Sequence, residues 1–366
     1  MVLFYITAED VFGQPTPGKR GPRPLHTIPA TVSGLYDLGM RHHVRRSVLS
    51  REVPDGFEAM PDWQLDRLVI RVALYSRENL GLEPGRRAAV FGRLSWLWPV
   101  VDFAATGFGA ASVGIEHDVS DEALEAVLRE AEPRAIFATD AESARRLLAL
   151  RSAGRLAGGV LVAEGLDDGA DGCLSLKRLF DLGGTLDTPE RSQGFRAVSR
   201  NVSADKEAMW HQGAASVLRL SHAEAMARIG ERLRAEPAQP GDVAYLETPR
   251  AALGARLALH AFVGDGLTST TIGREGRASE DIMQLRPHKM LVGAGWLEAA
   301  CAGRGPRWPA GLDGRQARRR LHEVLGDRLR WVETERLPEG GCATALAAVG
   351  ARLRLGALDG SRGTGH

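Results

Sequence analysis

The segment Gly293-Ala294-Gly295 comes nearest, by spacing alone, to a ligand-binding turn in this sequence. It follows a predicted strand and opens a predicted helix, where glycines let a pyrophosphate approach the backbone and the first helical N–H groups. A dinucleotide fingerprint needs a third glycine, and Glu298 stands in its place. The pattern therefore disfavours a dinucleotide site.

Other side chains that could do chemistry are not spaced for it. The basic run of Arg315, Arg318, Arg319 and Arg320 has the spacing of a solvated helix face, which is a simpler reading than a nucleic-acid surface. No His-x-x-x-His or C-x-x-C pair occurs, so we expect no metal site and no disulfide framework. No Gly-x-Ser-x-Gly elbow is present from which a hydrolase triad could start.

Size and composition set broad limits on the protein. Its 366 residues are 44% hydrophobic, which is enough for two packed α/β lobes, and the net charge of +1 gives no reason to expect a polyanionic partner. No apolar run reaches the ~20 residues that span a bilayer. The N-terminus lacks the basic flank of a signal peptide. We therefore expect a cytoplasmic protein with no transmembrane segment and no nucleic-acid partner.

Short apolar runs alternate with helical patterns from about residue 60 onward, which favours parallel sheets covered by helices. Predicted helices cover residues 63–79, 96–107, 121–131, 140–151, 221–234, 249–263, 279–285, 313–325 and 342–349. Predicted strands cover residues 86–92, 111–115, 136–138, 160–162, 242–246, 267–272, 288–292, 329–332 and 351–355. Residues 167–205 carry no such pattern, and we expect a looser connection there.

Several segments resemble, in the same order, parts of the large N-terminal domain of the AMP-forming acyl-CoA synthetases. Residues 80–92 resemble the family's "gl.pGdrVai.g" strand entry, and residues 98–115 resemble its "w...dlA.l..GavpvpI" helix and strand. Residues 122–140 resemble "eelayiL.dsea.vvfved". Residues 241–246, with Pro249 and Arg256, resemble the strand and "lPlaH...R" stretch. Residues 285–289, with Trp296 and Glu298, resemble "lrPT.lfgvPrvwE", and the long-chain acyl-CoA synthetases are the branch indicated.

This resemblance implies an α/β fold of two stacked doubly wound lobes. We predict an extended arm over residues 1–30, a first lobe over 31–205, a second lobe over 206–356 and a flexible tail over 357–366. Relative to the family, we expect the β-barrel end of the N-terminal domain to be lacking. The mobile C-terminal domain, which carries the family's catalytic lysine, is expected to be lacking as well.

The resemblance fails where the family binds the phosphates of ATP. The family's phosphate loop is rich in Ser, Thr and Gly, contains a lysine and ends at "lSH", which Ser221-His222 match. Before that match Gly213 survives, but the Thr-Thr pair is lost and Ser216 stands in the place of the lysine. A phosphate cradle needs small residues and a cation. We therefore interpret Gly213, Ser216, Ser221 and His222 as a vestigial phosphate-loop region.

The family's adenine loop, "YGxTE", is expected after the last strand, where Ala357, Asp359 and Ser361 stand. These residues would form a vestigial adenine-loop region, with no aromatic ring to stack on adenine. The acidic residue that helps to hold Mg²⁺ is missing from its position, and Ala252 replaces the histidine of "PlaH". We therefore predict no catalytic residue, no metal and no bound cofactor.

The function expected from this pattern is that of a pseudoenzyme, acting as a binding, scaffold or regulatory subunit of a complex. Its partner would be a full-length synthetase paralogue or a second copy of the chain. The contact would use an apolar patch or an open sheet edge at Trp331, Leu353 and Leu355. Two alternatives stay open: an AMP-forming acyl-acid ligase with divergent loops or a domain supplied by another chain, which would use ATP and Mg²⁺, and a sensor of an acyl group or acyl-CoA.

Overall fold

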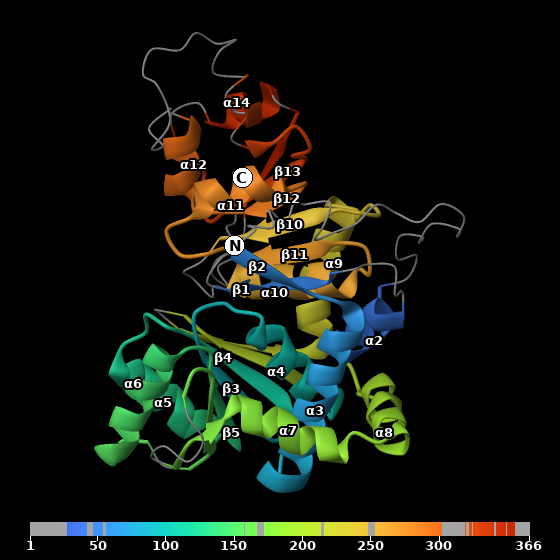
Figure 1. Ribbon diagram of the computed structural model, residues 1–366, viewed down its shortest axis with the longest axis vertical. Coiled ribbons are helices and arrows are strands. Elements are labelled where there is room, and N and C mark those ends of the chain that lie inside the picture. Colours follow the sequence, from blue (N-terminus) through green and yellow to red (C-terminus); the bar gives the residue numbers. More distant parts are fainter. Residues whose placement is uncertain are drawn as a thin grey trace, which may run out of the picture.

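Two seven-stranded sheets, with helices between and outside them, form the molecule (Figure 1). The computed structural model describes residues 28–41, 47–53, 56–156, 158–166, 172–213, 216–247, 253–301, 319, 322–323, 325–339, 342–348 and 350–355. Most of the predicted arm, the tail 357–366, most of the predicted helix 313–325, Pro249 and Ala252 lie outside the described residues. The predicted α/β class with two stacked lobes is confirmed.

The first sheet and the helices beside it come from the middle of the chain. Its strands are β3 (Arg87–Gly92), β4 (Ala111–Glu116), β5 (Ala135–Ala138), β6 (Val160–Ala163), β7 (Leu174–Ser175), β8 (Glu207–Gln212) and β9 (Val217–Ser221). Its helices are α3 (Asp62–Leu80), α4 (Leu97–Gly107), α5 (Asp121–Ala131), α6 (Ala141–Ser152), α7 (Leu176–Leu186) and α8 (Pro189–Arg200).

The second sheet combines an early hairpin with the later strands. Its strands are β1 (Leu49–Val53), β2 (Gly56–Met60), β10 (Val243–Leu246), β11 (Ser269–Ile272), β12 (Lys289–Leu291), β13 (Trp331–Thr334) and β14 (Arg352–Leu355). The helices packed with it are α2 (Val32–Arg41), α9 (His222–Ala235), α10 (Leu253–Gly264), α11 (Ala278–Leu285), α12 (Ala294–Cys301) and α14 (Cys342–Ala348).

Both sheets are doubly wound. The strand order is β7-β6-β5-β3-β4-β8-β9 in the first sheet and β14-β13-β12-β10-β11-β1-β2 in the second. All pairings are parallel except those of the edge strands β9 and β2, which are antiparallel to β8 and β1. The strands within residues 49–60 belong to the second sheet, and the strands within residues 207–221 belong to the first. Each sheet therefore contains strands from both sides of the lobe boundary that the sequence predicted at 205/206.

The prediction that residues 167–205 form a loose connection is wrong, because α7 and α8 lie there. Ser175 and Thr188 cap these helices by accepting hydrogen bonds from the N–H groups of Arg178 and Arg191. In α8 only Phe195 and Ser199 are buried. A helix that buries so little has no apolar stripe, which is the signal that sequence periodicity needs.

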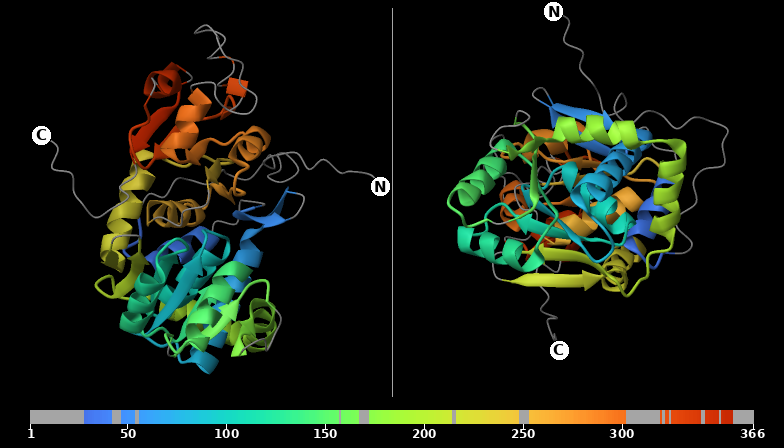
Figure 2. Two further views of the ribbon diagram at one scale, coloured as in Figure 1. Left: turned by 90° about the vertical axis from the view of Figure 1, so that its left-hand side faces the viewer. Right: turned by 90° about the horizontal axis from the view of Figure 1, so that it is seen from below.

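A shared hydrophobic core lies between the two sheets. In β3, Ala88 and Val90 face this central core, whereas Ala89 and Phe91 face the separate cluster under α5 and α6. In β10, Leu246 faces the central core and Tyr245 faces a third cluster beneath α11 and α12. This alternation places α4 and α10 in a layer between the sheets, and the left view of Figure 2 shows the two lobes stacked from another side.

A fully buried ion pair joins α4 to α10 across the central layer. The Arg256 guanidinium donates to both carboxylate oxygens of Asp102, at 2.9 and 2.6 Å, and His260 Nε2 lies 2.7 Å from the same carboxylate. Burial alone would raise the pKa of Asp102. The Arg256 charge and the hydrogen bonds of His260 and Arg256 outweigh it and hold that pKa well below its usual value. The carboxylate therefore stays ionised.

The same guanidinium reaches the first sheet. Arg256 Nη1 donates to the carbonyl oxygen of Trp210 at 2.6 Å, and Nη2 donates to Ser112 Oγ at 3.0 Å. A Cβ atom on Gly114 in β4 would lie 2.5 Å from Arg256 Nη1. The glycine inside this strand thus marks a close approach, which lets a side chain of the second lobe rest against the first sheet.

Replacing Arg256 by methionine should destabilise the protein strongly, because it leaves the Asp102 carboxylate buried without its cation. The expected loss is about 3–5 kcal/mol in the free energy of unfolding, measured by urea titration. The control is Arg129→Met, which removes an exposed pair with Glu125 within α5 and should change stability by less than about 0.5 kcal/mol. Equal, small effects of both substitutions would show that the ion pair does not hold the lobes together.

A buried histidine fixes α2 against α9. His222 Nδ1 accepts the backbone N–H of Val32, the first residue of α2, at 3.2 Å. Ser221 caps α9 by accepting the N–H of Glu224, whose carboxylate accepts the N–H of Ser221 in return. The His222 side chain is fully buried, and burial lowers its pKa to about 4. The folded protein therefore holds a neutral imidazole at this position at neutral pH.

Stability should fall as the pH drops from about 6.5 to 4. The unfolded chain binds a proton on His222 in this window and the folded chain does not, so the free energy of unfolding rises with pH by up to about 1.4 kcal/mol per unit. His222→Asn keeps an acceptor for the Val32 N–H but cannot titrate. Urea unfolding between pH 4 and 7 should therefore show a shallower pH dependence for the variant, and identical slopes would contradict this assignment.

Candidate functional site

The carboxyl ends of the parallel strands in both sheets open toward the same side of the molecule. Arg93, directly after β3 of the first sheet, forms an ion pair at 3.4 Å with Glu275, which follows β11 of the second sheet. Ligands of doubly wound proteins bind outside the carboxyl ends of the strands. We call this side the carboxyl-end face and take it as the candidate site.

The predicted phosphate-loop segment lies partly at this face, as a β-hairpin. We expected a loop that contains Gly213 and Ser216 and ends at Ser221-His222. That expectation is wrong for most of its length, because β8 and β9 lie there and pair with Gln212 opposite Val217. Residues 214–215 lie outside the described residues. Gly213 and Ser216 flank the turn, and the Gly213 N–H donates to the Ser216 carbonyl oxygen at 3.2 Å. That N–H is therefore already used within the chain.

The four residues of the predicted phosphate-loop region do not come together. Gly213 and Ser216 lie at the carboxyl end of β8, whereas Ser221 pairs with Glu207 at its amino end. The length of β9 separates them, about 3.3 Å per residue. Ser221 and His222 serve α9 and α2, as described above. Ser221 and His222, which match "lSH", therefore have a structural role near the amino end of β8, away from the carboxyl-end face.

A buried carboxylate lies next to the turn. His211 Nε2 lies 3.0 Å from Glu116 Oε1, and a Cβ on Gly213 would be 3.6 Å from the same oxygen. Burial lowers the pKa of His211 in spite of the hydrogen bond with Glu116. At neutral pH the imidazole therefore brings no positive charge to the turn.

On the second sheet, two further carboxylates occupy the segment Gly293-Ala294-Gly295. Glu247, after β10, accepts the Gly293 N–H at 2.6 Å. Glu335, after β13, accepts the Ala294 N–H on both oxygens, at 2.9 and 3.0 Å. Burial, together with the charge of Glu335, raises the pKa of Glu247 against the opposing effect of the Gly293 hydrogen bond. These carboxylates use the N–H groups at the start of α12 that a phosphate would require.

Glu335 is a site residue that the sequence analysis did not find. We placed the adenine loop at Ala357, Asp359 and Ser361, which lie outside the described residues. The Thr-Glu pair of "YGxTE" also occurs at Thr334-Glu335, where β13 ends beside β12. Had the pair been considered together with the strand that precedes it, the sequence could have placed Glu335 at this face.

Three arginines near this face already have acidic partners. Arg93 pairs with Glu142 and Glu275, Arg256 with Asp102, and Arg274 donates to Asp281 at 2.8 and 2.6 Å. Lys289 in β12 is buried, and its Nζ donates to the Glu236 carbonyl oxygen. Among the described residues, no group of three or more His, Cys, Asp or Glu side chains is arranged to hold a metal ion.

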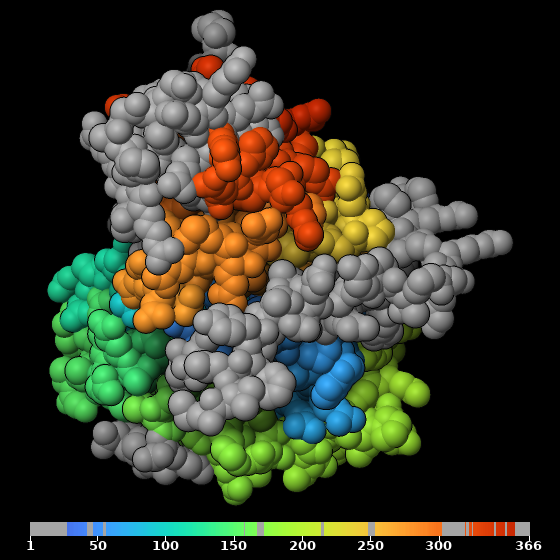
Figure 3. All heavy atoms as spheres, turned by 45° about the horizontal axis from the view of Figure 1, so that its top comes forward, coloured from blue at the N-terminus to red at the C-terminus, as the bar shows by residue number. Residues whose placement is uncertain are grey.

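The partner residues predicted in the second lobe lie on an edge strand and its neighbour. Within the described residues, β14 pairs only with β13. Leu355 is 48% exposed, Leu353 packs on the third cluster beneath α11 and α12, and the Trp331 ring lies 5.2 Å from the Arg352 guanidinium. Figure 3 shows residues of this final part of the chain at the molecular surface, in red. No helix in the described ranges is long and apolar enough to cross a bilayer.

Comparisons with known proteins fit this architecture. Residues 63–246 match the family described as AMP-binding enzymes. A stretch of 130 residues is 30% identical to the long-chain-fatty-acid–CoA ligase FadD15 of Mycobacterium bovis. That stretch covers 35% of this chain and only 21% of the ligase, so the chain matches about a fifth of that relative's length.

Solved structures show the same fold at low sequence identity. The luciferase-like enzyme of the mealworm Zophobas morio superimposes with a TM-score of 0.70 at 13% identity, over 92% of this chain and 75% of that one. A putative long-chain-fatty-acid CoA ligase of Rhodopseudomonas palustris gives 0.67 at 15% identity, over 88% and 74%. The A domain of a carboxylic acid reductase of Segniliparus rugosus gives 0.65 at 15% identity, over 88% and 59%. From the match over residues 63–246, this chain belongs to the family of AMP-binding enzymes.

Proposed function

We propose that this family member is catalytically silent and acts as a binding, scaffold or regulatory subunit of a protein complex. The observation that carries the proposal is the set of carboxyl groups at the strand ends of the carboxyl-end face. Glu116, Glu164 and Glu247 stand at or directly after the ends of β4, β6 and β10. A polyphosphate brought to this face would meet carboxylates.

The turn between β8 and β9 adds a second argument. Adenylation places negative charge on a phosphoryl group, and loss of one preorganised stabilising contact costs about 10²–10³ in rate. Here Ser216 replaces the lysine, and the Gly213 N–H is bonded within the turn. Arg256, a cation near His211, is held by Asp102. Near this turn, the described residues therefore offer few cations or N–H donors that could offset the repulsion between a polyphosphate and the carboxylates.

The purified chain should show no ATP–pyrophosphate exchange above background with fatty or aryl acids. The reason is that Ser216 stands in the place of the lysine and that the Gly213 N–H is already bonded to the Ser216 carbonyl oxygen. The assay follows transfer of labelled pyrophosphate into ATP, with a catalytically active acyl-CoA synthetase as the positive control. Robust exchange by this chain alone would exclude the pseudoenzyme proposal and favour the ligase with divergent loops.

The proposed partner surface is the exposed edge of β14. An unpaired strand edge can add a strand from another chain, and a stable complex buries about 1,200–2,000 Å² in total. Leu355 gives this edge an exposed apolar side chain. Arg354 leans away from it toward Glu236 and Glu333, at 3.5 and 3.9 Å. A full-length synthetase paralogue or a second copy of the chain is the partner we propose.

Leu355→Asp should dissociate the complex, because a charge on the proposed edge would have to be desolvated on binding. Sedimentation of the wild-type chain at micromolar concentration, alone and with the paralogue, should show a larger species that the variant lacks. Leu353→Asp should act in the same direction. The control is Leu337→Asp, which changes a leucine that is 63% exposed and lies off the strand. A monomeric wild type, or equal effects of Leu355→Asp and Leu337→Asp, would refute this assembly.

A further inference from the structure

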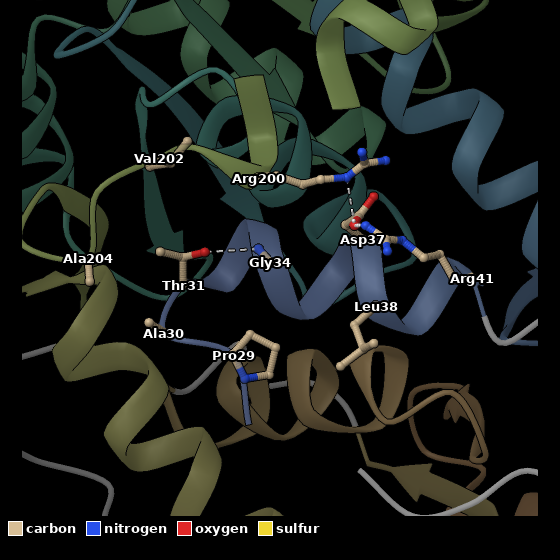
Figure 4. A pocket seen from close by; sticks show the side chains of 10 residues that line it. All are labelled: Pro29, Ala30, Thr31, Gly34, Asp37, Leu38, Arg41, Arg200, Val202 and Ala204. Atoms are coloured by element: carbon tan, nitrogen blue, oxygen red, sulfur yellow. Dashed lines mark hydrogen bonds and ion pairs between the residues drawn. The ribbon is translucent and has the colours of Figure 1, made fainter. Parts of the chain in front are cut away.

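A cavity of about 350 Å³ lies where α2, the end of α8 and the segment before β8 meet (Figure 4). Its wall contains Asp37 and Arg41 of α2, Arg200 at the end of α8, and Val202 and Ala204 ahead of β8. Its volume falls within the range of about 300–1,000 Å³ that is usual for small-molecule sites. This segment leads into the amino end of β8. The cavity therefore lies on the amino-end side of the first sheet, opposite the carboxyl-end face.

One end of the cavity is charged, and only one of the two carboxylate oxygens of Asp37 there has hydrogen-bond partners. Arg41 and Arg200 both donate to Oδ2 of Asp37, Arg200 through Nε at 3.2 Å. The Asp37 side chain is only 7% exposed, and its Oδ1 is buried with no hydrogen-bond partner. The two guanidiniums are about half exposed, at 54% and 49%. Two cations against one carboxylate leave a net charge of +1 at this end.

The remaining wall of the cavity is mostly apolar. It is formed by Pro29, Ala30, Leu38, Val202 and Ala204, with Thr31 and Gly34 between the two ends. The Thr31 hydroxyl accepts the Gly34 N–H at 3.0 Å and the Ser33 hydroxyl at 3.3 Å, as Figure 4 shows for the first of these bonds. A ligand that fits both ends must therefore combine one negative charge with a compact apolar body.

We propose that this cavity binds a small 2-hydroxy carboxylate with an apolar side chain. The carboxylate neutralises the excess positive charge, since guanidinium N–H groups that do not bond Asp37 can pair with both of its oxygens. Figure 4 shows Asp37 between the two half-exposed guanidiniums, so a turn of these side chains toward the ligand opens Oδ1 of Asp37 to its hydroxyl. The hydroxyl donates to Oδ1, which satisfies the buried oxygen, and the side chain of the ligand lies against Leu38 and Val202.

The test compares two acids that differ by a single hydroxyl, 2-hydroxy-4-methylpentanoate and 4-methylpentanoate, titrated calorimetrically into the full-length wild-type chain. A hydrogen bond to a charged group predicts about tenfold tighter binding of the hydroxy acid. Absence of binding, or equal affinity for the two acids, would overturn the proposal. This comparison requires no variant and does not depend on whether the carboxyl-end face binds ATP or on the partner surface.

Two variants locate the binding. Arg200→Gln removes one guanidinium of the cavity and should weaken binding of the hydroxy acid by about tenfold or more. Arg191→Gln changes an arginine on the same helix that pairs with Glu78 at 2.8 Å and does not line the cavity, so it should leave the affinity unchanged. Equal loss in both variants, with thermal unfolding showing both folded, would place the binding elsewhere and reject the assignment.

Discussion

The Asp102–Arg256 ion pair is the constraint on which the arrangement of the two lobes depends. Neither side chain is exposed, and each would be costly to bury alone. Arg256 belongs to α10 of the second lobe, yet it rests on the first sheet at Gly114 and bonds the backbone of β8. One side chain therefore fixes α4, α10 and β8 together. This fixes the position at which the carboxyl ends of the two sheets meet.

The same ion pair stabilises the fold but gives no free cation to the carboxyl-end face. Arg256 lies near His211 and the Gly213 turn, but its guanidinium is already paired with the Asp102 carboxylate. The strand ends meanwhile carry Glu116, Glu247 and Glu335, and the last two occupy backbone N–H groups at the start of α12. These carboxyl groups and their hydrogen bonds support the proposal that the carboxyl-end face binds no polyphosphate. Fold and site depend on different residues.

Sequence reasoning succeeded where a single element carries its own pattern. The strands β3 and β4 and the helices α4, α5 and α6 were predicted within about a residue. Their apolar runs are continuous, and the caps Ser120 of α5 and Asp140 of α6 are local. It failed for α8, which buries little, and for the β8–β9 hairpin, where the resemblance to a loop was followed. The cavity at Asp37 and Arg200 is lined by residues far apart in the chain, so no local sequence pattern could predict it.

We propose that the carboxyl-end face binds no acyl-adenylate. The most direct measurement is a calorimetric titration of the full chain with a non-hydrolysable acyl-adenylate analogue, which probes the phosphate and adenine positions together without requiring turnover. We expect no saturable heat up to millimolar analogue, because carboxyl groups stand at the strand ends and the Gly213 N–H is already bonded. Saturable binding at micromolar concentration that is lost when Gly213 is replaced by a bulky residue would contradict it.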